Sequence, residues 1–269
     1  MHRARARKLG PATFLLDRVA EELAERLSAV KRTFERAADV GTPTDALRCA
    51  LSGQVGAFAD VVADEEALPF APGSLDLAVS ALALQFVNDL PGTLIQIRRA
   101  LKPDGLFLAA LIGGESLTEL RQAFAAAEAE VEGGVSPRVA PFADLRDLGA
   151  LLQRAGFALP VTDVDRVIVR YASPLDLMHD LRRMGAANAM TERRHVPLRR
   201  ATLKRMIEIY AERFAGTDGR IAATFEIVWL SGWAPHESQQ QPLAPGSAKT
   251  RLADALRTKE IPAGEKTGQ

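Results

Sequence analysis

The sequence is poor in cysteine, in histidine and in net charge. The single cysteine, Cys49, cannot form a disulfide within the chain or a cysteine zinc cluster, and it fits a reducing compartment. It stands in a predicted helix, where we expect a small core residue. Four scattered histidines give no reason to expect a metal site. Lysine plus arginine and aspartate plus glutamate both total 34, so no global charge indicates a nucleic-acid partner.

Long apolar runs are also missing. No stretch approaches the ~20 apolar residues that a membrane-spanning helix needs, so we expect no span and at most a peripheral association. The basic start is followed by a segment that Asp17, Arg18 and Glu21 interrupt, which excludes a secretory signal. We therefore expect a cytoplasmic protein. What remains is an ordinary globular composition over 269 residues, 47% hydrophobic and 25% charged, enough for one or two domains.

Short apolar runs alternate with helical patterns and predict an α/β fold. The runs at 57–63, 76–84 and 106–112 are continuously apolar, as in strands of a parallel sheet that are buried on both faces. A half-exposed strand is expected at 161–171 and a last strand at 221–233. The predicted helices cover residues 12–30, 46–51, 90–101, 115–131, 142–155, 174–187 and 197–215.

These elements predict three parts of the chain. Residues 1–33 form an N-terminal helical segment, and residues 34–234 form the α/β domain. The helices at about 174–215 are expected to be an insertion over one end of the sheet. Residues 235–269, rich in Pro, Gly and Gln, are expected to form a surface tail with a short helix near 252–256.

Ligands of an open parallel sheet bind beyond the carboxyl ends of its strands, so the loops there hold the candidate residues. Gly41, after Asp39, permits the close approach of a ligand to the next helix N-terminus. Asp64, Glu65 and Glu66 form an acidic loop suited to accept hydrogen bonds. Each feature also has an ordinary interpretation, as a strand-to-helix turn or a solvated helix start.

Several other side chains leave two interpretations open. Gln85 and Phe86 offer an amide and an aromatic face at a strand end, and Phe86 is as well placed for a core as for a ligand platform. Glu115, after two glycines, is either a charge at a helix N-terminus or a catalytic group. Arg182 and Arg183 form either a solvated face or a grip for an acidic partner. No nucleophile elbow of the G-x-S-x-G form occurs, which argues against a serine hydrolase.

A longer stretch carries a family resemblance. Residues 61–121 read VVADEEALPFAPGSLDLAVSALALQFVNDLPGTLIQIRRALKPDGLFLAALIGGESLTELR and resemble class I S-adenosylmethionine-dependent methyltransferases of the methyltransferase-11 type. The segments EGGVSPRVAPFADLRDLGALLQRAGF and GWAPHESQ resemble, more narrowly, the subfamily of the mitochondrial complex I assembly factor that acts as an arginine hydroxylase. The resemblance covers roughly residues 9–264.

The resemblance implies a Rossmann-like fold that binds S-adenosyl-L-methionine and modifies a protein or small-molecule acceptor, with a complex I subunit among the candidates. In the family, the residues matching Asp39 and Gly41 line the methionine end of the cofactor, and the residue matching Asp64 reaches the adenine side. Many relatives carry His-Trp where this chain has Gln85-Phe86, which leaves a proton-transfer role without its histidine. The candidate cofactor-binding residues are Asp39, Gly41, Asp64, Glu65, Ser80 and Ala81.

One spacing departs from the family. Only 23 residues separate Gly41 from Asp64, and a single strand-helix step needs about 25, so only one step fits. The family places two steps there, and an acidic residue at the end of the second strand holds the ribose hydroxyls. Asp60 falls inside the expected strand and is poorly placed to substitute. The sequence thus predicts an abbreviated cofactor half and leaves two functions open: a methyltransferase, or an assembly or interaction protein that has lost the cofactor.

Overall fold

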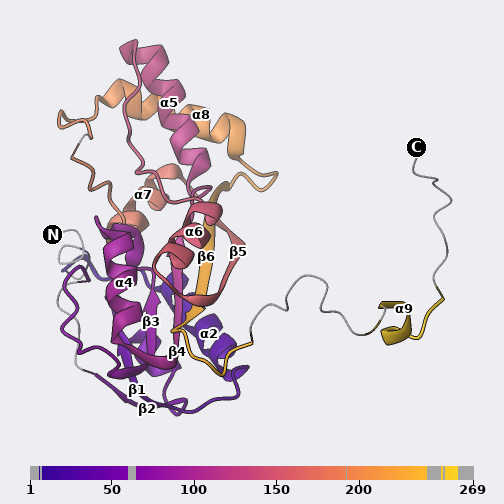
Figure 1. Ribbon diagram of the computed structural model, residues 1–269. Coiled ribbons are helices and arrows are strands. Elements are labelled where there is room, and N and C mark those ends of the chain that lie inside the picture. The colour runs from indigo at the N-terminus through magenta and orange to yellow at the C-terminus, as the bar shows by residue number, and fades with distance from the viewer. Residues whose placement is uncertain are drawn as a thin grey trace, which may run out of the picture. The chain divides into compact units, whose positions relative to one another are not determined.

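A six-stranded mixed sheet forms the centre of the structure (Figure 1), in the order β2-β1-β3-β4-β6-β5. The first four strands run parallel, whereas β6 is antiparallel to both β4 and β5. The strands are β1 (Phe34–Asp39), β2 (Val55–Phe58), β3 (Leu75–Ala81), β4 (Leu101–Ile112), β5 (Ala158–Tyr171) and β6 (Ile221–Trp233). The computed structural model describes residues 6, 8–59, 65–191, 193–240, 250 and 252–259.

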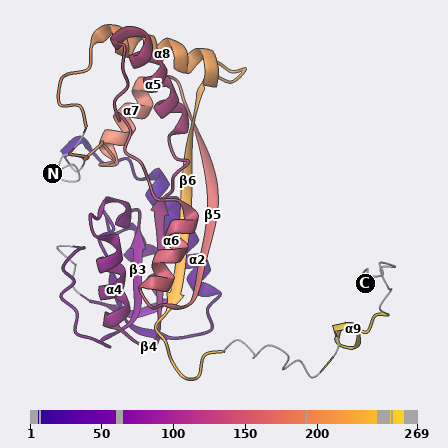
Figure 2. The same cartoon turned by 45° about the horizontal axis from the view of Figure 1, so that its top comes forward.

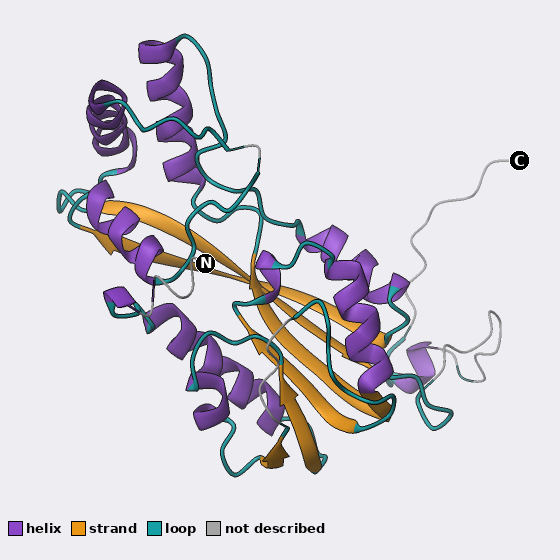
Figure 3. Ribbon diagram, turned by 90° about the vertical axis from the view of Figure 1, so that its left-hand side faces the viewer, coloured by secondary structure: helices purple, strands orange, loops and turns teal. Residues whose placement is uncertain are grey.

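Helices cover both faces of this sheet (Figure 3). Leu77 and Leu106 belong to the core that α2 (Phe14–Ser28) and α3 (Ala46–Ala50) bury. Their neighbours Ala78 and Phe107 belong to the core under α4 (Leu90–Ala100) and α6 (Leu145–Arg154). Because successive side chains of a strand point to opposite faces, a strand that is apolar at every position requires such a two-sided cover. The structure therefore confirms the predicted α/β class.

A helical extension lies beyond one end of the sheet (Figure 2). It contains α5 (Thr118–Glu132), α7 (Pro174–Arg183) and α8 (Arg200–Phe214), and α5 packs along α8. The hydroxyl of Tyr210 in α8 donates to the carbonyl oxygen of Ala222 at the start of β6, at 2.8 Å. The long strands β5 and β6 thus support the extension. It contains the predicted insertion helices α7 and α8 and, in addition, α5.

The segment after β1 is short, as its spacing predicts. Among the described residues, β2 is the only strand beyond β1 at this edge of the sheet. It pairs with β1 in parallel, and the pairing begins at Phe34 and Val55. The predicted strand at 57–63 begins earlier, at Val55, and its residues 60–63 lie outside the described residues. The described part of the segment between β1 and residue 59 therefore contains one strand-helix step.

Three local predictions differ from the structure. Cys49 is exposed on α3, because the single buried side chain of this short helix is that of Leu47. Glu115 precedes the first turn of α5, where the acidic residue is Glu119, so the helix-charge interpretation of Glu115 is wrong. The strand predicted at 106–112 begins earlier, because β4 starts at Leu101, directly after α4, and includes Asp104 with its left-handed φ of 61°.

Residues from His236 onward form a separate unit, whose described part contains the short helix α9 (Leu252–Ala255).

The aromatic pair under α4 and α6 predicts a large stability loss. Phe107 is fully buried and stacks on Phe157 with ring centroids 5.3 Å apart. We expect Phe107→Ala to lower the free energy of unfolding by about 3–5 kcal/mol, because the cavity left behind is lined by a rigid sheet and two helices. Ile168→Ala, at a side chain that is 64% exposed, is the control and should change it by less than about 0.5 kcal/mol. Urea unfolding of both variants measures the difference.

Candidate cofactor and acceptor site

Two hydrogen bonds join the carboxyl ends of β1 and β3. The hydroxyl of Ser80 donates to the carbonyl oxygen of Val40 at 2.7 Å, and the backbone N–H of Ala81 donates to Oγ1 of Thr42 at 3.0 Å. Ser80 and Ala81 are both fully buried. These two predicted site residues therefore fix the loop after β1 to the end of β3. The Ser80 hydroxyl and the Ala81 N–H are both used in hydrogen bonds within the protein.

Asp39 ends β1 as a buried carboxylate. Its side chain lies 3.8 Å from Arg48, measured from Oδ2 to Nε, and Oδ1 has no hydrogen-bond partner among the described residues. Burial raises the pKa of Asp39, while a hydrogen bond from Thr42 and the charge of Arg48 partly oppose that rise. A buried carboxylate oxygen without a donor is costly, so it favours a ligand that brings an N–H or O–H group to this edge.

Gly41 and Glu65 meet directly above this edge. Gly41 has a φ of +74°, a left-handed conformation that favours glycine. The flexible side chain of Glu65 lies in the space that a Cβ at this position would occupy. The carboxylate of Glu65, in the loop after β2, thus lies over Gly41, where the sequence predicts the close approach of a ligand.

The rest of the acidic loop is bonded to α4 and to the segment before it. Oε1 of Glu66 accepts hydrogen bonds from the backbone and side-chain amides of Asn88, at 2.6 and 3.0 Å. The hydroxyl of Thr93 donates to the carbonyl oxygen of Glu65 at 3.1 Å. Asp64 itself lies outside the described residues. The structure thus brings together five of the six predicted cofactor-binding residues, and Glu66 has a structural role.

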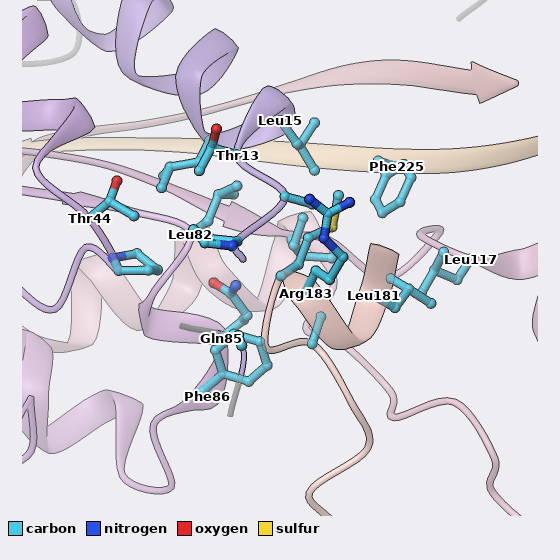
Figure 4. Close-up of a pocket in the computed structure, with 18 of the residues that line it drawn as sticks. Thr13, Leu15, Thr44, Leu82, Gln85, Phe86, Leu117, Leu181, Arg183 and Phe225 are labelled. Atoms are coloured by element: carbon cyan, nitrogen blue, oxygen red, sulfur yellow. The ribbon is translucent and has the colours of Figure 1, made fainter. Parts of the chain in front are cut away.

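A small apolar cavity, here called the inner cavity, opens beside these strand ends and has a volume of about 80 Å³ (Figure 4). Side chains from the start of α2, the loop after β1, the end of β3 and α7 converge on it. Gln85, Thr44 and Arg183 are polar residues in its wall, and Oε1 of Gln85 is buried without a hydrogen-bond partner among the described residues. Its apolar lining includes Leu15, Leu82, Phe86, Leu117, Leu181 and Phe225.

A second cavity, here called the acceptor cavity, has a volume of about 420 Å³. It lies between η1 (Leu84–Phe86) and the helical extension, and it shares Gln85 and Phe86 with the inner cavity. Phe86 is 36% exposed and lines both cavities, so the interpretation of Phe86 as a core residue is wrong. The two cavities are therefore neighbours that share part of their lining at the strand ends.

The structure adds a candidate site residue that the sequence did not reveal. Arg138 lines the acceptor cavity although its loop contains none of the motifs associated with sites. Its Nε donates to Oε1 of Glu128 at 2.7 Å, and this contact between α5 and the following loop forms only in the tertiary structure. Arg182 lines the same cavity and Arg183 lines the inner one, so the pair does more than form a solvated face.

No group of three histidine, cysteine, aspartate or glutamate side chains in the described ranges is placed to hold a metal ion. No helix in that part of the chain is both long enough and apolar enough to cross a membrane.

Comparison with known proteins places the chain in a family. A methyltransferase domain family, Methyltransf_11, matches residues 22–109. "Arginine-hydroxylase NDUFAF5, mitochondrial" of Danio rerio is 39% identical over 263 residues, which cover 90% of this chain and 81% of that protein. The human protein of the same name is 37% identical over 286 residues, covering 97% of this chain and 83% of its own. The chain belongs to the class I methyltransferases, in the NDUFAF5 subfamily.

More distant similarities agree with this family. A "Malonyl-[acyl-carrier protein] O-methyltransferase" of Laribacter hongkongensis is 40% identical over 186 residues, which cover 69% of this chain and 60% of that enzyme. The structure of a putative methyltransferase from Bacillus halodurans superposes with a TM-score of 0.52 at 15% identity, covering 80% of this chain and 99% of its own. The latter supports the Rossmann-like methyltransferase fold of this NDUFAF5-subfamily chain.

The comparisons also correct the expected location. The NDUFAF5 proteins of fish, mouse and human all carry the word mitochondrial in their names. The expectation of a cytoplasmic protein rested on the lack of a secretory signal, and such a lack does not distinguish the cytoplasm from an organelle. That expectation is therefore wrong.

The buried carboxylate predicts a pH-dependent effect of Asp39→Asn. Because burial raises the pKa of Asp39 in the folded state, the stability that the protonated side chain contributes is present at low pH and is lost as the pH rises through the raised pKa. We expect Asp39→Asn to gain stability relative to the parent protein between about pH 4 and pH 7. Thermal or urea unfolding at both pH values measures this change.

Asp17→Asn is the control, because Asp17 is an exposed aspartate on α2 and is not among the charges that shift the pKa of Asp39. Its stability should follow that of the parent protein at both pH values. An Asp39→Asn variant that loses stability at neutral pH would contradict the expected cost of the buried charge.

Proposed function

We propose that this NDUFAF5-subfamily chain is an S-adenosyl-L-methionine-dependent methyltransferase that acts on a protein acceptor, with a subunit of respiratory complex I as the first candidate. The observation that carries the proposal is the buried, unpartnered Oδ1 of Asp39, which lies at the switch edge of the sheet beside the left-handed Gly41. Membership of the methyltransferase family supports the cofactor, and the subfamily supports the acceptor.

The described residues fit the methionine end of the cofactor. Asp39 is placed to accept hydrogen bonds from an ammonium group or an ordered water, and Gly41 lets a ligand approach the backbone. For the ribose side we propose Glu65, because its carboxylate belongs to the loop after β2 and lies over Gly41. Asp64 stays a candidate on the resemblance alone.

The bound cofactor supplies an electrophilic methyl group, and the protein supplies position and a dry surrounding. The cofactor would supply this methyl group to a nucleophilic atom of the acceptor, whose proton would leave to solvent. Leu82 and Phe86 give the wall of the inner cavity an apolar surface, and Gln85 offers an amide to orient the acceptor. Methyl transfer of this kind requires no covalent nucleophile from the protein.

Arginine hydroxylation is the second candidate function. The names of the relatives that match 90–97% of the chain favour it. Hydroxylation requires an oxidant and a source of electrons, and these reagents distinguish it experimentally from methyl transfer. With either reaction, we propose that the protein acts where complex I is assembled, as the resemblance to the assembly factor implies.

Cofactor titration tests the proposed function directly. We expect S-adenosylmethionine to bind the full chain with a dissociation constant of about 100 μM or tighter, roughly −5.5 kcal/mol. Millimolar cofactor should also raise the melting temperature, because a ligand that binds the folded state alone stabilises it. Glu65→Gln should weaken binding about tenfold, since it removes a charge-assisted hydrogen bond to the ribose hydroxyls.

Glu21→Gln is the matched control for that loss, because Glu21 is exposed on α2 and away from the site. It should bind the cofactor as the parent protein does. No heat of binding and no shift of the melting temperature at millimolar cofactor would instead favour a cofactor-free interaction protein. Cofactor binding without methyl transfer to complex I subunits, together with oxidant-dependent modification of them, would favour hydroxylation.

A further inference from the structure

The acceptor cavity has an unusual balance of charge. Arg138 and Arg182 lie in its wall, and its described lining residues include no aspartate or glutamate. The other polar groups are uncharged amides, such as those of Asn88 and Asn188. Most of the remaining lining is apolar and includes Phe86, Leu120, Phe124, Val139, Phe142 and Met178. A cationic or strongly polar occupant would therefore meet like charge or lose its hydration.

Arg138 is held so that one nitrogen remains available. Its side chain is 14% exposed, and its Nε donates to Glu128, which is itself fully buried. Ser136 also donates to Glu128 through its backbone N–H, at 2.6 Å, and through its hydroxyl. Nη2 of Arg138 is buried and has no hydrogen-bond partner among the described residues. A rigidly positioned guanidinium nitrogen without an acceptor is suited to bind a carboxylate.

Arg182 adds a second positive charge at the same cavity. It is exposed in the last turn of α7, and it makes no ion pair with another described residue. Because its charge is in contact with water, it contributes less to affinity than Arg138 and more to the attraction of an anion.

We infer that the acceptor cavity recognises an acidic side chain of the acceptor protein, whose carboxylate pairs with the guanidinium group of Arg138. This inference rests on the proposed function, in which the acceptor is a protein. The apolar wall accommodates a neighbouring hydrophobic side chain, and Gln85 and Phe86 join this cavity to the inner cavity. The acidic residue is thus an anchor, and the residue to be modified lies next to it and points toward the strand ends.

Three matched peptides test this inference on the full chain. They have the form acetyl-Phe-Xaa-Leu-amide, in which Xaa is glutamate, glutamine or lysine, and calorimetry measures their binding without cofactor. We expect the glutamate peptide to bind at least tenfold more tightly than the glutamine peptide and the lysine peptide to bind most weakly. The preference should fall as the salt concentration rises, since part of it comes from the exposed Arg182.

Variants assign the preference to Arg138. Arg138→Gln should remove the difference between the glutamate and glutamine peptides. Because that change leaves Glu128 buried without its cation, the double variant Glu128→Gln/Arg138→Gln, which removes both charges, provides a second and more stable test. Arg182→Gln should reduce the preference in part. Arg146→Gln, at an exposed arginine on α6 outside the cavity lining, is the control and should leave it unchanged.

The outcomes separate this inference from the proposed function. A preference that persists in both Arg138 variants, equal binding of the three peptides, or no binding of any of them would overturn the acidic anchor. Failure of the cofactor titration would overturn the methyltransferase and would leave the peptide preference intact, because the peptides are titrated without cofactor. Charge-selective peptide binding by a chain that binds no cofactor would therefore identify a protein-interaction site on this fold.

Discussion

The site depends on the joining of two strand ends that are far apart in the sequence. The bonds from Ser80 to Val40 and from Ala81 to Thr42 tie the loop after β1 to the end of β3. They add to the backbone hydrogen bond from Val40 to Val79 and help to fix the left-handed turn at Gly41 relative to the edge of the sheet. Both bonds lie in a buried setting, where a lost partner leaves a polar group unsatisfied and the geometry is strongly preferred. Asp39 and Glu65 take their positions from this edge.

The acceptor side depends on a second interaction, the buried carboxylate of Glu128. Burial alone would raise the pKa of this group, but hydrogen bonds from Ser136 and Arg138 outweigh burial and hold the pKa below its usual value. Arg194 pairs with Glu132 one turn further along α5 and lies 3.8 Å from Glu128. These contacts tie the loops before α6 and before α8 to α5. Helix α5 thus holds Arg138 in position at the wall of the acceptor cavity.

The two parts are placed together by the topology of the sheet. Strand β6 returns antiparallel beside β4 and extends, with β5, past the ends of the parallel strands. The extension it carries stands over the edge at which ligands of parallel sheets bind. The inner cavity and the acceptor cavity therefore share Gln85 and Phe86, although the other residues that line them come from both halves of the chain.

The sequence by itself determined the strands, the helices and the α/β class, because continuous apolar runs and helical periodicity report burial directly. It also indicated Asp39 and Gly41 and the single short step after them, since these depend on local spacing. Only the tertiary structure decided that Cys49 is exposed, that Glu65 lies over Gly41, and that Arg138 faces a cavity. Those features arise from contacts between segments that are distant in the chain, and local patterns carry no information about which distant side chain supplies a partner.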